Sequence, residues 1–342
     1  MRRRNHMPFH PLRDAGYSLI EMMISLTLGL IIMAALGGML VEQLNLRSEL
    51  DRSSRMIGNG TYAISLLSSE LKLAGFYDAM DPTALALPAA MPDPCSETAA
   101  DIAAALRLHV QGYDAATATS AAAAPPACVT GAATALRTGS DILVIRRADT
   151  AVAIDPAAAT NGTHYLQASL CPLDTATFLL DAYPVNLTLR QKGCTASSTT
   201  PYAQVRPFHV EIYFVDGNHE AGDGVPTLKK IALRDGVFGD PVSLVEGVEF
   251  LQVEYGLDND ADGVADTYSS CAACTVANWA SVVSAKLHLV ARAHEPTRGY
   301  VEDKVFTLGT AGTVGPYNDT IKRASYQQLV RLVNPSARRE LP

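Results

Sequence analysis

The stretch Gly16-Tyr17-Ser18-Leu19-Ile20-Glu21 stands directly before twenty residues, Met22 to Val41, that carry no formal charge. A helix of twenty residues is about 30 Å long, which matches the hydrocarbon core of a bilayer. Residues 1–16 carry four arginines and one aspartate, and short basic flanks stay on the cytoplasmic side of a membrane. We therefore predict a single transmembrane helix over 22–41, with the N-terminus in the cytoplasm.

The small residue that could mark a cleavage site lies before the apolar run. A secretory signal has its small-residue site after the run, and the end of this run, Leu36 to Glu42, contains no clear site of that kind. Gly16 instead precedes the run. Glu21 begins the apolar helix, where a carboxylate is costly unless it is paired, so it is a functional candidate. The alternative is that Glu21 lies at the headgroup level, near a favourable helix N-terminus.

The helical pattern continues beyond the apolar run. Apolar residues recur at spacings of three, four or seven, which is one stripe of an amphipathic helix, and Gly75 is a candidate C-cap. The stripe consists of Leu46, Leu50, Ile57, Ile64, Leu67, Leu71 and Ala74. We predict one helix over 18–74, about 85 Å long, whose second half packs on a sheet.

The string from Gly16 to Glu21, after a short basic leader and before the apolar run, resembles the class III signal of type IV prepilins. Three later segments are similar to the PilW family of type IV minor pilins. These segments are Glu49-Leu50-Asp51-Arg52, Asn59-Gly60-Thr61-Tyr62-Ala63 and Leu71-Lys72-Leu73-Ala74-Gly75-Phe76-Tyr77. The resemblance implies an α+β, type IV pilin-like fold, in which a long N-terminal helix packs on an antiparallel β-sheet.

The resemblance also implies how the chain is processed and used. A prepilin peptidase would cut between Gly16 and Tyr17 and methylate the amine of Tyr17. Glu21 would then neutralise the N-terminal amine of a neighbouring subunit during assembly, because two charges in an apolar fibre are tolerable only as a pair. Tyr17 departs from the usual phenylalanine but keeps the ring.

The function that the resemblance implies is structural, without enzymatic activity. We expect a minor pilin of a type IV pilus, in the tip or priming complex, anchored in the inner membrane and later part of a periplasmic and extracellular pilus. Its expected partners are other minor and major pilins, the prepilin peptidase, the inner-membrane assembly platform and a tip adhesin. The alternatives are a minor pseudopilin of a type II secretion system and a calcium-dependent adhesin at the pilus tip.

The remainder of the chain divides by composition. We expect a leader over 1–16, the long helix within 17–78, an Ala/Pro-rich variable insertion over 79–140 with one short helix near 102–108, and a β-rich domain over 141–342. Strand patterns without intervening helices favour an antiparallel sheet. The expected strands are 142–146, 210–215, 251–257, 283–289, 301–308 and 326–333.

An acidic loop provides the clearest ligand pattern. Residues 258–266 fit D-x-D-x-D-G-x-x-D, with Asp258, Asp260 and Asp262 at positions 1, 3 and 5 of an EF-hand register. Val264 would offer its carbonyl and Asp266 would stand at position 9, and these five residues are the predicted metal ligands. Position 12 is Ser269 rather than glutamate, so we predict a structural Ca²⁺ loop grafted on the sheet. The alternative is a solvated acidic turn.

The six cysteines indicate disulfides in an oxidising compartment. Nearest-neighbour pairing joins Cys95 to Cys128, Cys171 to Cys194 and Cys271 to Cys274, although six cysteines allow fifteen pairings. The C-x-x-C pair also matches half of a zinc site or a redox motif. No second C-x-x-C accompanies it, and we favour a disulfide that clips the loop.

Composition and motifs exclude several classes. The net charge of −8 gives no reason to expect a nucleic-acid partner. Residues 58–63 match a loose dinucleotide fingerprint, but they lie in a helical pattern without a preceding strand. The chain has no G-x-S-x-G, Walker A or H-E-x-x-H. The histidines are scattered, and His288 is expected on the solvent-exposed face of a strand.

Overall fold

The computed structural model describes residues 16, 18–131, 135–184, 187–195 and 201–340. These residues form two compact units, Met1–Asp51 and Arg52–Pro342. Residues 1–15 of the predicted leader, together with Tyr17, lie outside the described residues.

One helix, α1 (Leu19–Leu73), accounts for the described secondary structure of the first unit and continues into the second. It ends where the sequence predicts. Gly75 adopts φ +70°, a left-handed conformation that favours glycine, and its N–H donates to the carbonyl of Arg146.

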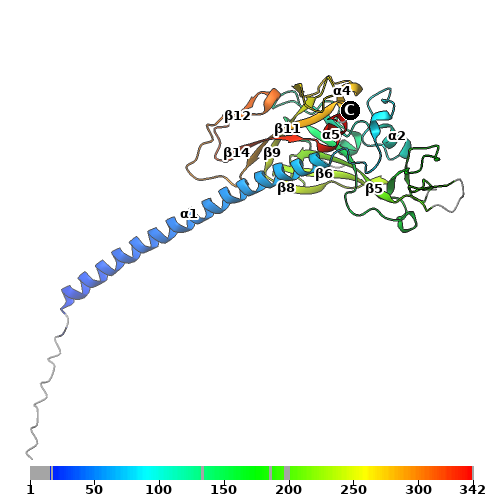
Figure 1. Cartoon of the computed structure of the whole chain (residues 1–342). Helices are drawn as coiled ribbons and strands as arrows, with labels where there is room; N and C mark the ends of the chain where they lie inside the picture. Colours follow the sequence, from blue (N-terminus) through cyan, green and yellow to red (C-terminus); the bar gives the residue numbers. More distant parts are fainter. Residues whose placement is uncertain (1–15, 17, 132–134, 185–186, 196–200, 341–342) are drawn as a thin grey trace, which may run out of the picture. The chain divides into compact units, whose positions relative to one another are not determined.

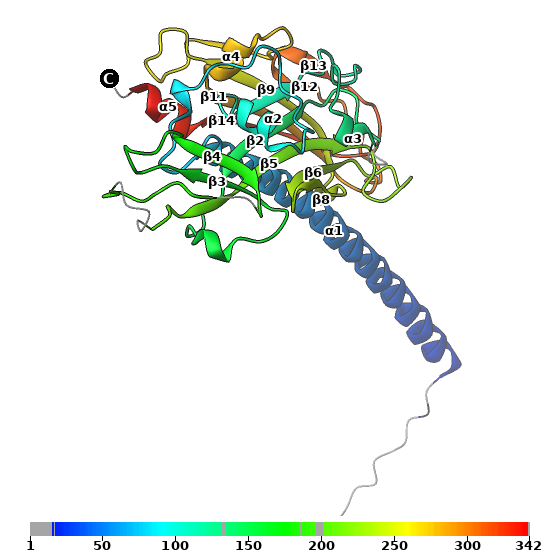
Figure 2. The same cartoon turned by 90° about the vertical axis from the view of Figure 1, so that its right-hand side faces the viewer.

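The second unit is built from antiparallel strands in three sheets (Figures 1 and 2). The main path of the eight-stranded sheet is β1 (Val110–Tyr113), β2 (Ile142–Ala148), β5 (Val205–Asp216), β3 (His164–Ala168) and β4 (Phe178–Ala182). Strand β6 (Thr227–Arg234) pairs with β5 and also carries β7 (Val237–Phe238) and β8 (Val242–Glu246). The four-stranded sheet has the order β10 (Thr267–Ser269), β9 (Val248–Leu257), β11 (Val282–Arg292) and β14 (Arg323–Arg331). In the two-stranded sheet, β12 (Phe306–Thr307) pairs with β13 (Thr313–Val314).

The C-terminal part of α1 forms the largest core with residues from both main sheets. Its buried side chains include Ile64, Leu67 and Leu71 of the predicted stripe and meet apolar residues of β2, β5, β9, β11 and β14. The predicted stripe is wrong at Ile57, which is exposed while Met56 beside it is buried. Each fully buried leucine contributes about 1.5–3 kcal/mol relative to an exposed one. The helix residues in this core are Met56, Ala63, Ile64, Leu67 and Leu71, and Ala74 follows directly after the helix. The amphipathic stripe therefore explains why this half of the helix docks.

The segment predicted as a variable insertion contributes to a second core. It contains η1 (Pro82–Ala84), α2 (Ala99–Ala104), β1 and α3 (Ala127–Gly131). Residues Ile102, Leu106 and Val129 pack with apolar residues of β2, β5 and β6. Strand β1 pairs with β2 in regular antiparallel register, from Val110 opposite Ile145 to Tyr113 opposite Ile142. This stretch is thus part of the eight-stranded sheet as well as a source of loops.

Two predicted elements differ from the structure. The short helix lies at Ala99–Ala104, earlier than expected, because Thr98 caps it by accepting from the N–H of Asp101. The strand predicted over 301–308 is wrong except for Phe306–Thr307. Val301 and Val305 are exposed, and Glu302 instead turns its buried side chain to accept from the N–H of Arg323.

The elements not yet named are short. They are η2 (Pro156–Ala158), α4 (Val276–Ala280), η3 (Gly309–Ala311) and α5 (Val333–Glu340). The helix α4 has a capping box made by Thr275 and Asn278.

The six cysteines form three disulfides, in the same pairs that nearest-neighbour pairing predicts. Cys95–Cys128 ties the segment before α2 to α3, and Cys171–Cys194 closes the region after β3. Cys271–Cys274 closes the turn between β10 and α4. These bonds staple loop-rich parts of the chain that have few strands to hold them.

Candidate functional site

The start of α1 carries a reciprocal cap. The backbone N–H of Ser18 donates to Oε2 of Glu21 at 3.0 Å, and the N–H of Glu21 donates to the hydroxyl of Ser18 at 3.3 Å. This is a capping box, which satisfies two of the donors that a helix N-terminus leaves free. Glu21 is therefore held at the first turn of α1.

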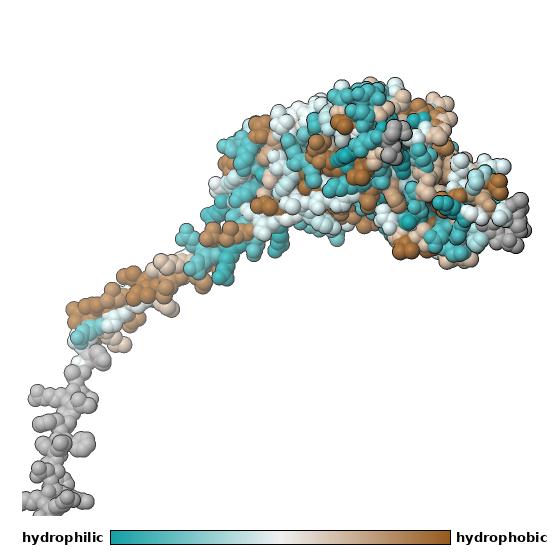
Figure 3. All heavy atoms as spheres, viewed as in Figure 1, coloured by the Kyte–Doolittle hydropathy of each residue, from teal (hydrophilic) through white to brown (hydrophobic). Residues whose placement is uncertain are grey.

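The first unit exposes the whole apolar run. The large apolar side chains between Leu19 and Val41 are each more than half exposed, and α1 is long and apolar enough to cross a membrane. Figure 3 shows much of this stretch as hydrophobic on the face in view, with a paler and hydrophilic area near its start. An exposed apolar surface of this extent is unfavourable in water and marks a membrane or protein contact. Gly29, Gly37 and Gly38 have no atom near their missing Cβ positions, so packing within the chain does not require them.

The acidic loop connects β9 to β10. Carboxylate oxygens of Asp258, Asp260 and Asp262 all lie within 4.8 Å of one another, so three of the predicted ligands converge. Gly263 has φ +84°, the sharp turn that position 6 of an EF-hand requires. A Cβ there would lie 2.6 Å from the carbonyl oxygen of Ser336 in α5, so glycine also allows the loop to approach that helix.

Asp258 is the anchor of this loop. Its carboxylate accepts from the N–H of Ala261 at 2.6 Å and from the N–H of Gly263 at 2.9 Å, and it is buried. Arg339 of α5 adds an ion pair, with Nη1 3.2 Å from Oδ2. Burial would raise the pKa of Asp258, but these donors and Arg339 together lower it, so the carboxylate is ionised at neutral pH.

Asp260 is exposed, and its pKa is shifted in the opposite direction to that of Asp258. The N–H of Asp262 lowers its pKa, but desolvation and the charges of the neighbouring carboxylates outweigh this and raise it. A divalent cation would relieve that repulsion, which is why the donor set fits a hard ion such as Ca²⁺.

The remaining predicted ligands fit less closely. Asp266 is not part of the converging group, and its carboxylate accepts from the N–H of Asn259 at 2.7 Å. The N–H of Val264 donates to Asp262, and Val264 has an exposed side chain. Position 12, Ser269, belongs to β10, where its hydroxyl accepts from the N–H of Cys271. The disulfide Cys271–Cys274 therefore follows the loop directly.

One residue at the acidic loop, Arg339, was not predicted from the sequence, and the prediction of an exposed His288 is wrong. Arg339 lies 81 residues after Asp258, and no motif links the two. His288 is buried rather than exposed, because η3 covers it: a Cβ at Gly309 would lie 2.8 Å from its Nε2.

Comparisons with known proteins match the N-terminal motif and part of the β-rich domain. A family model described as "Type IV Pilus-assembly protein W" matches residues 212–334, and one described as "Prokaryotic N-terminal methylation motif" matches residues 12–37. No curated protein matches the chain. Among solved structures, a type IV-like pilin from Thermus thermophilus is similar, with 14% identity, 59% of this chain and 81% of that chain covered, and a TM-score of 0.27.

Proposed function

We propose that this chain, a type IV pilin-like minor pilin of the PilW family, is a subunit of the tip or priming complex that initiates assembly of a type IV pilus. The observation that carries the proposal is the methylation motif joined directly to an apolar run whose large side chains are each more than half exposed. Such a helix is stable in lipid before assembly and among sister helices afterwards.

The proposed pairing role of Glu21 follows from the transfer of the helix from lipid into the fibre. A carboxylate that enters an apolar fibre needs a cationic partner, and the amine of a neighbouring Tyr17 would provide one. The capping box holds Glu21 at the first turn of α1. In this proposal the chain is inserted in the inner membrane with its N-terminus in the cytoplasm, and the assembly platform moves it into the fibre.

The acidic loop adds a second proposed property. Ca²⁺ would be held by Asp258, Asp260 and Asp262 and would offset their mutual repulsion. It would stiffen the connection between β9 and β10 and the contact of that loop with α5. Extracellular sites with few ligands have dissociation constants of about 10⁻⁴–10⁻³ M, which suits a protein outside the cytoplasm.

A genetic experiment tests the assembly role. Cells that lack the chain should make normal amounts of major pilin but few surface pili. The parent chain should restore piliation, and Gly16→Ala should not, because its leader stays attached. Gly29→Ala is the matched control, since its missing Cβ faces open space within the chain, and it should restore piliation. Normal piliation without the chain would contradict the proposal.

The same cells distinguish a role in the pilus from a role as a minor pseudopilin in type II secretion. The pilus role predicts that secreted enzymes reach the medium in normal amounts while surface pili are lost. A secretion defect with normal pili would instead favour a minor pseudopilin.

A further inference from the structure

Strand β14 leaves one edge of the four-stranded sheet open. It is the last strand in the order β10-β9-β11-β14, and with 9 residues it is the longest edge strand in the part of the chain that the structure describes (Figure 1). Its pairing with β11 is in regular register from Arg323 to Arg331. A long and regular edge strand is a template on which a strand of another chain can pair.

The hydrogen bonds just beyond the two ends of β14 show which of its backbone groups point outward. The N–H of Leu332 donates to the carbonyl of Val283, and the N–H of Ala293 donates to the carbonyl of Lys322. Hydrogen-bonded pairs alternate along an antiparallel ladder. The even-numbered residues of β14 therefore bond to β11, and the odd-numbered residues turn their N–H and C=O groups away from it.

A side chain caps only the start of this outward edge. At Arg323 the outward N–H donates to Oε2 of Glu302 at 2.8 Å. The next four odd-numbered residues are exposed, and their outward backbone groups have no hydrogen-bond partner among the described residues. They are Ser325, Gln327, Leu329 and Arg331. Alternate residues of a strand are about 6.8 Å apart, so these free donors and acceptors stand in a row with the repeat of another strand.

The sequence of this edge lacks the features that usually protect an open edge. Residues 324–330 contain no charged residue and no proline. Charged side chains, prolines and bulges are the means by which proteins prevent such edges from pairing. Leu329, which is 59% exposed, even adds an apolar side chain. The edge is therefore open to a further strand.

The helix α1 provides an apolar surface beside the open edge. Tyr326 of β14 faces the helix, where its hydroxyl donates to the carbonyl oxygen of Ile57, and the side chain of Ile57 is 53% exposed. Asn59 is two residues later, and so about 160° around the helix, and its side chain donates to Glu246 of β8. Ile57 therefore lies on the β14 side of α1, where a strand added to β14 would pack against it.

We propose that β14 pairs with an extended segment of a different polypeptide, about seven residues long, which adds a strand to this sheet. The backbone of that segment would bond to the free groups from Ser325 to Arg331. Its side chains would alternate, apolar toward Ile57 and polar on the opposite face, since strand addition combines backbone hydrogen bonds with contacts of alternate side chains. Such a partner is possible in a pilus and in a pseudopilus alike.

A second copy of this chain fits the edge less well. Antiparallel pairing of two β14 strands in one continuous sheet requires a two-fold axis perpendicular to the sheet. Because α1 packs on the face of the sheet, this axis would run the two docked helices in opposite directions. Opposite directions do not suit two chains anchored in one membrane, and this favours a different polypeptide.

Hydrogen exchange at single amides, measured by mass spectrometry with electron-transfer fragmentation, tests the pairing directly. In the isolated full chain in detergent micelles, the N–H groups of Gln327 and Leu329 should exchange at least about 100-fold faster than those of Gln328 and Val330, which bond to β11. The same chain is also cross-linked in the membranes of its own cells and purified with its partners. There the exchange at Gln327 and Leu329 should be at least about tenfold slower than in the isolated chain. This result does not depend on whether the chain is needed for piliation.

A pair of variants tests the backbone contact itself. Gln327→Pro removes one outward N–H and no bond to β11, because proline is tolerated where the N–H of an edge strand faces solvent. Gln327→Ala is the matched control, since it changes the same side chain and keeps the N–H. The two isolated variants should have Tm values within about 3 °C of each other, and Gln327→Pro should recover at least about tenfold less cross-linked partner. Ser325→Pro and Ser325→Ala repeat the comparison if Gln327→Pro destabilises the isolated chain.

Three results would each overturn the proposal. The first is equally fast exchange at Gln327 and Leu329 in the assembled and the isolated chain. The second is recovery of as much partner with the proline variant as with its alanine control. The third is that the cross-links at β14 join two copies of this chain.

Discussion

A Cβ atom at Gly60 would lie 2.2 Å from Cε2 of Tyr326, so α1 and β14 approach each other as closely as a glycine allows. The hydroxyl of Tyr326 also donates to the carbonyl oxygen of Ile57, one turn earlier in the helix. The ring is therefore held between the helix and the four-stranded sheet, and it sets the distance between them.

Gly60→Ala should destabilise the protein by about 1–3 kcal/mol, because the methyl group displaces the ring of Tyr326 from a packed site. Gly58→Ala is the matched control. It lies in the same helix with no atom within 4 Å of the added Cβ, and it should stabilise by up to about 1 kcal/mol through helix propensity. Thermal unfolding of the two variants in detergent measures both. Equal effects of the two changes would mean that the Tyr326 contact does not set the docking of the helix.

Glu21→Ala should leave cleavage intact and abolish incorporation into pili, because the amine of the neighbouring subunit loses its partner. Glu42→Ala, at the other end of the apolar run, removes one carboxylate of the same kind and should assemble normally. Immunoblots of sheared pili and of membranes give both readouts. Incorporation of the Glu21 variant at the parent level would refute the pairing role.

Calcium should stabilise the parent chain against heat. With a dissociation constant near 10⁻⁴ M, 10 mM Ca²⁺ contributes about 2.7 kcal/mol, which raises Tm by roughly 5 °C. Asp260→Asn combined with Asp262→Asn should remove this shift, while Asp240→Asn, an exposed carboxylate outside the loop, should retain it. The same shift in the double variant, or none in the parent, would exclude a calcium site here.

Stability should fall as pH rises from about 6.5 to 8 because of Asp141. Burial raises its pKa to about 8, and this outweighs the N–H donors of Ala115 and Val253, which lie 2.8 Å from its two oxygens. An unfolded aspartate releases its proton near pH 4, so between the two values the folded state binds more protons, and stability is lost as pH rises. His109, whose pKa burial lowers to about 4, gives the opposite slope but only below about pH 6.5.

The asparagine in the Asp141→Asn variant cannot titrate. The variant's free energy of unfolding should therefore lose this dependence on pH, whatever its absolute value. Denaturant titrations in detergent at pH 6.5 and 8 measure the difference, which should be about 1–2 kcal/mol in the parent. An unchanged slope in the variant would assign the pH dependence to another group.

The parts of this structure that follow from local patterns could be predicted from the sequence. The stripe that ends at Ala74, the left-handed Gly75 and the turn at Gly263 each depend on residues close in the chain. The same holds for the disulfides, whose partners are at most 33 residues apart.

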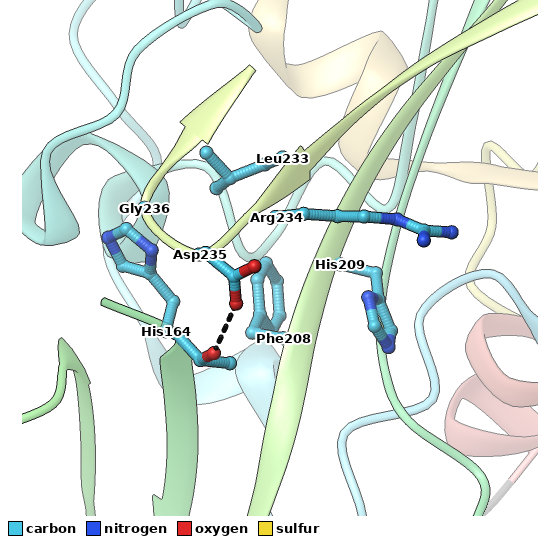
Figure 4. Close-up of a pocket in the computed structure, with 8 residues that line it drawn as sticks. His164, Phe208, His209, Leu233, Arg234, Asp235 and Gly236 are labelled. Carbon is cyan, nitrogen blue, oxygen red and sulfur yellow. Dashed lines mark hydrogen bonds between the residues drawn. The ribbon is translucent and has the colours of Figure 1, made fainter. Parts of the chain in front are cut away.

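The rest depends on distant partners that no local pattern specifies. Val301 and Val305 have strand propensity but face solvent, because Glu302 and Arg323 hold that segment out of the sheet. Arg339 reaches Asp258 only because α5 packs against the acidic loop. Thr163 donates to Asp235 only because β5 brings β3 and β6 together (Figure 4). Such contacts arise from the topology of the sheets, which the strand order along the chain does not reveal.

The proposed role requires an apolar helix that is trimmed on its cytoplasmic side and kept in the mature protein. Intact-mass and N-terminal fragment spectra of the native chain, purified from membranes and from sheared pili, test this most directly. We predict a protein that begins at N-methylated Tyr17 and retains residues 18–41. A chain that still begins at Met1, or one that has lost the apolar run, would contradict the account.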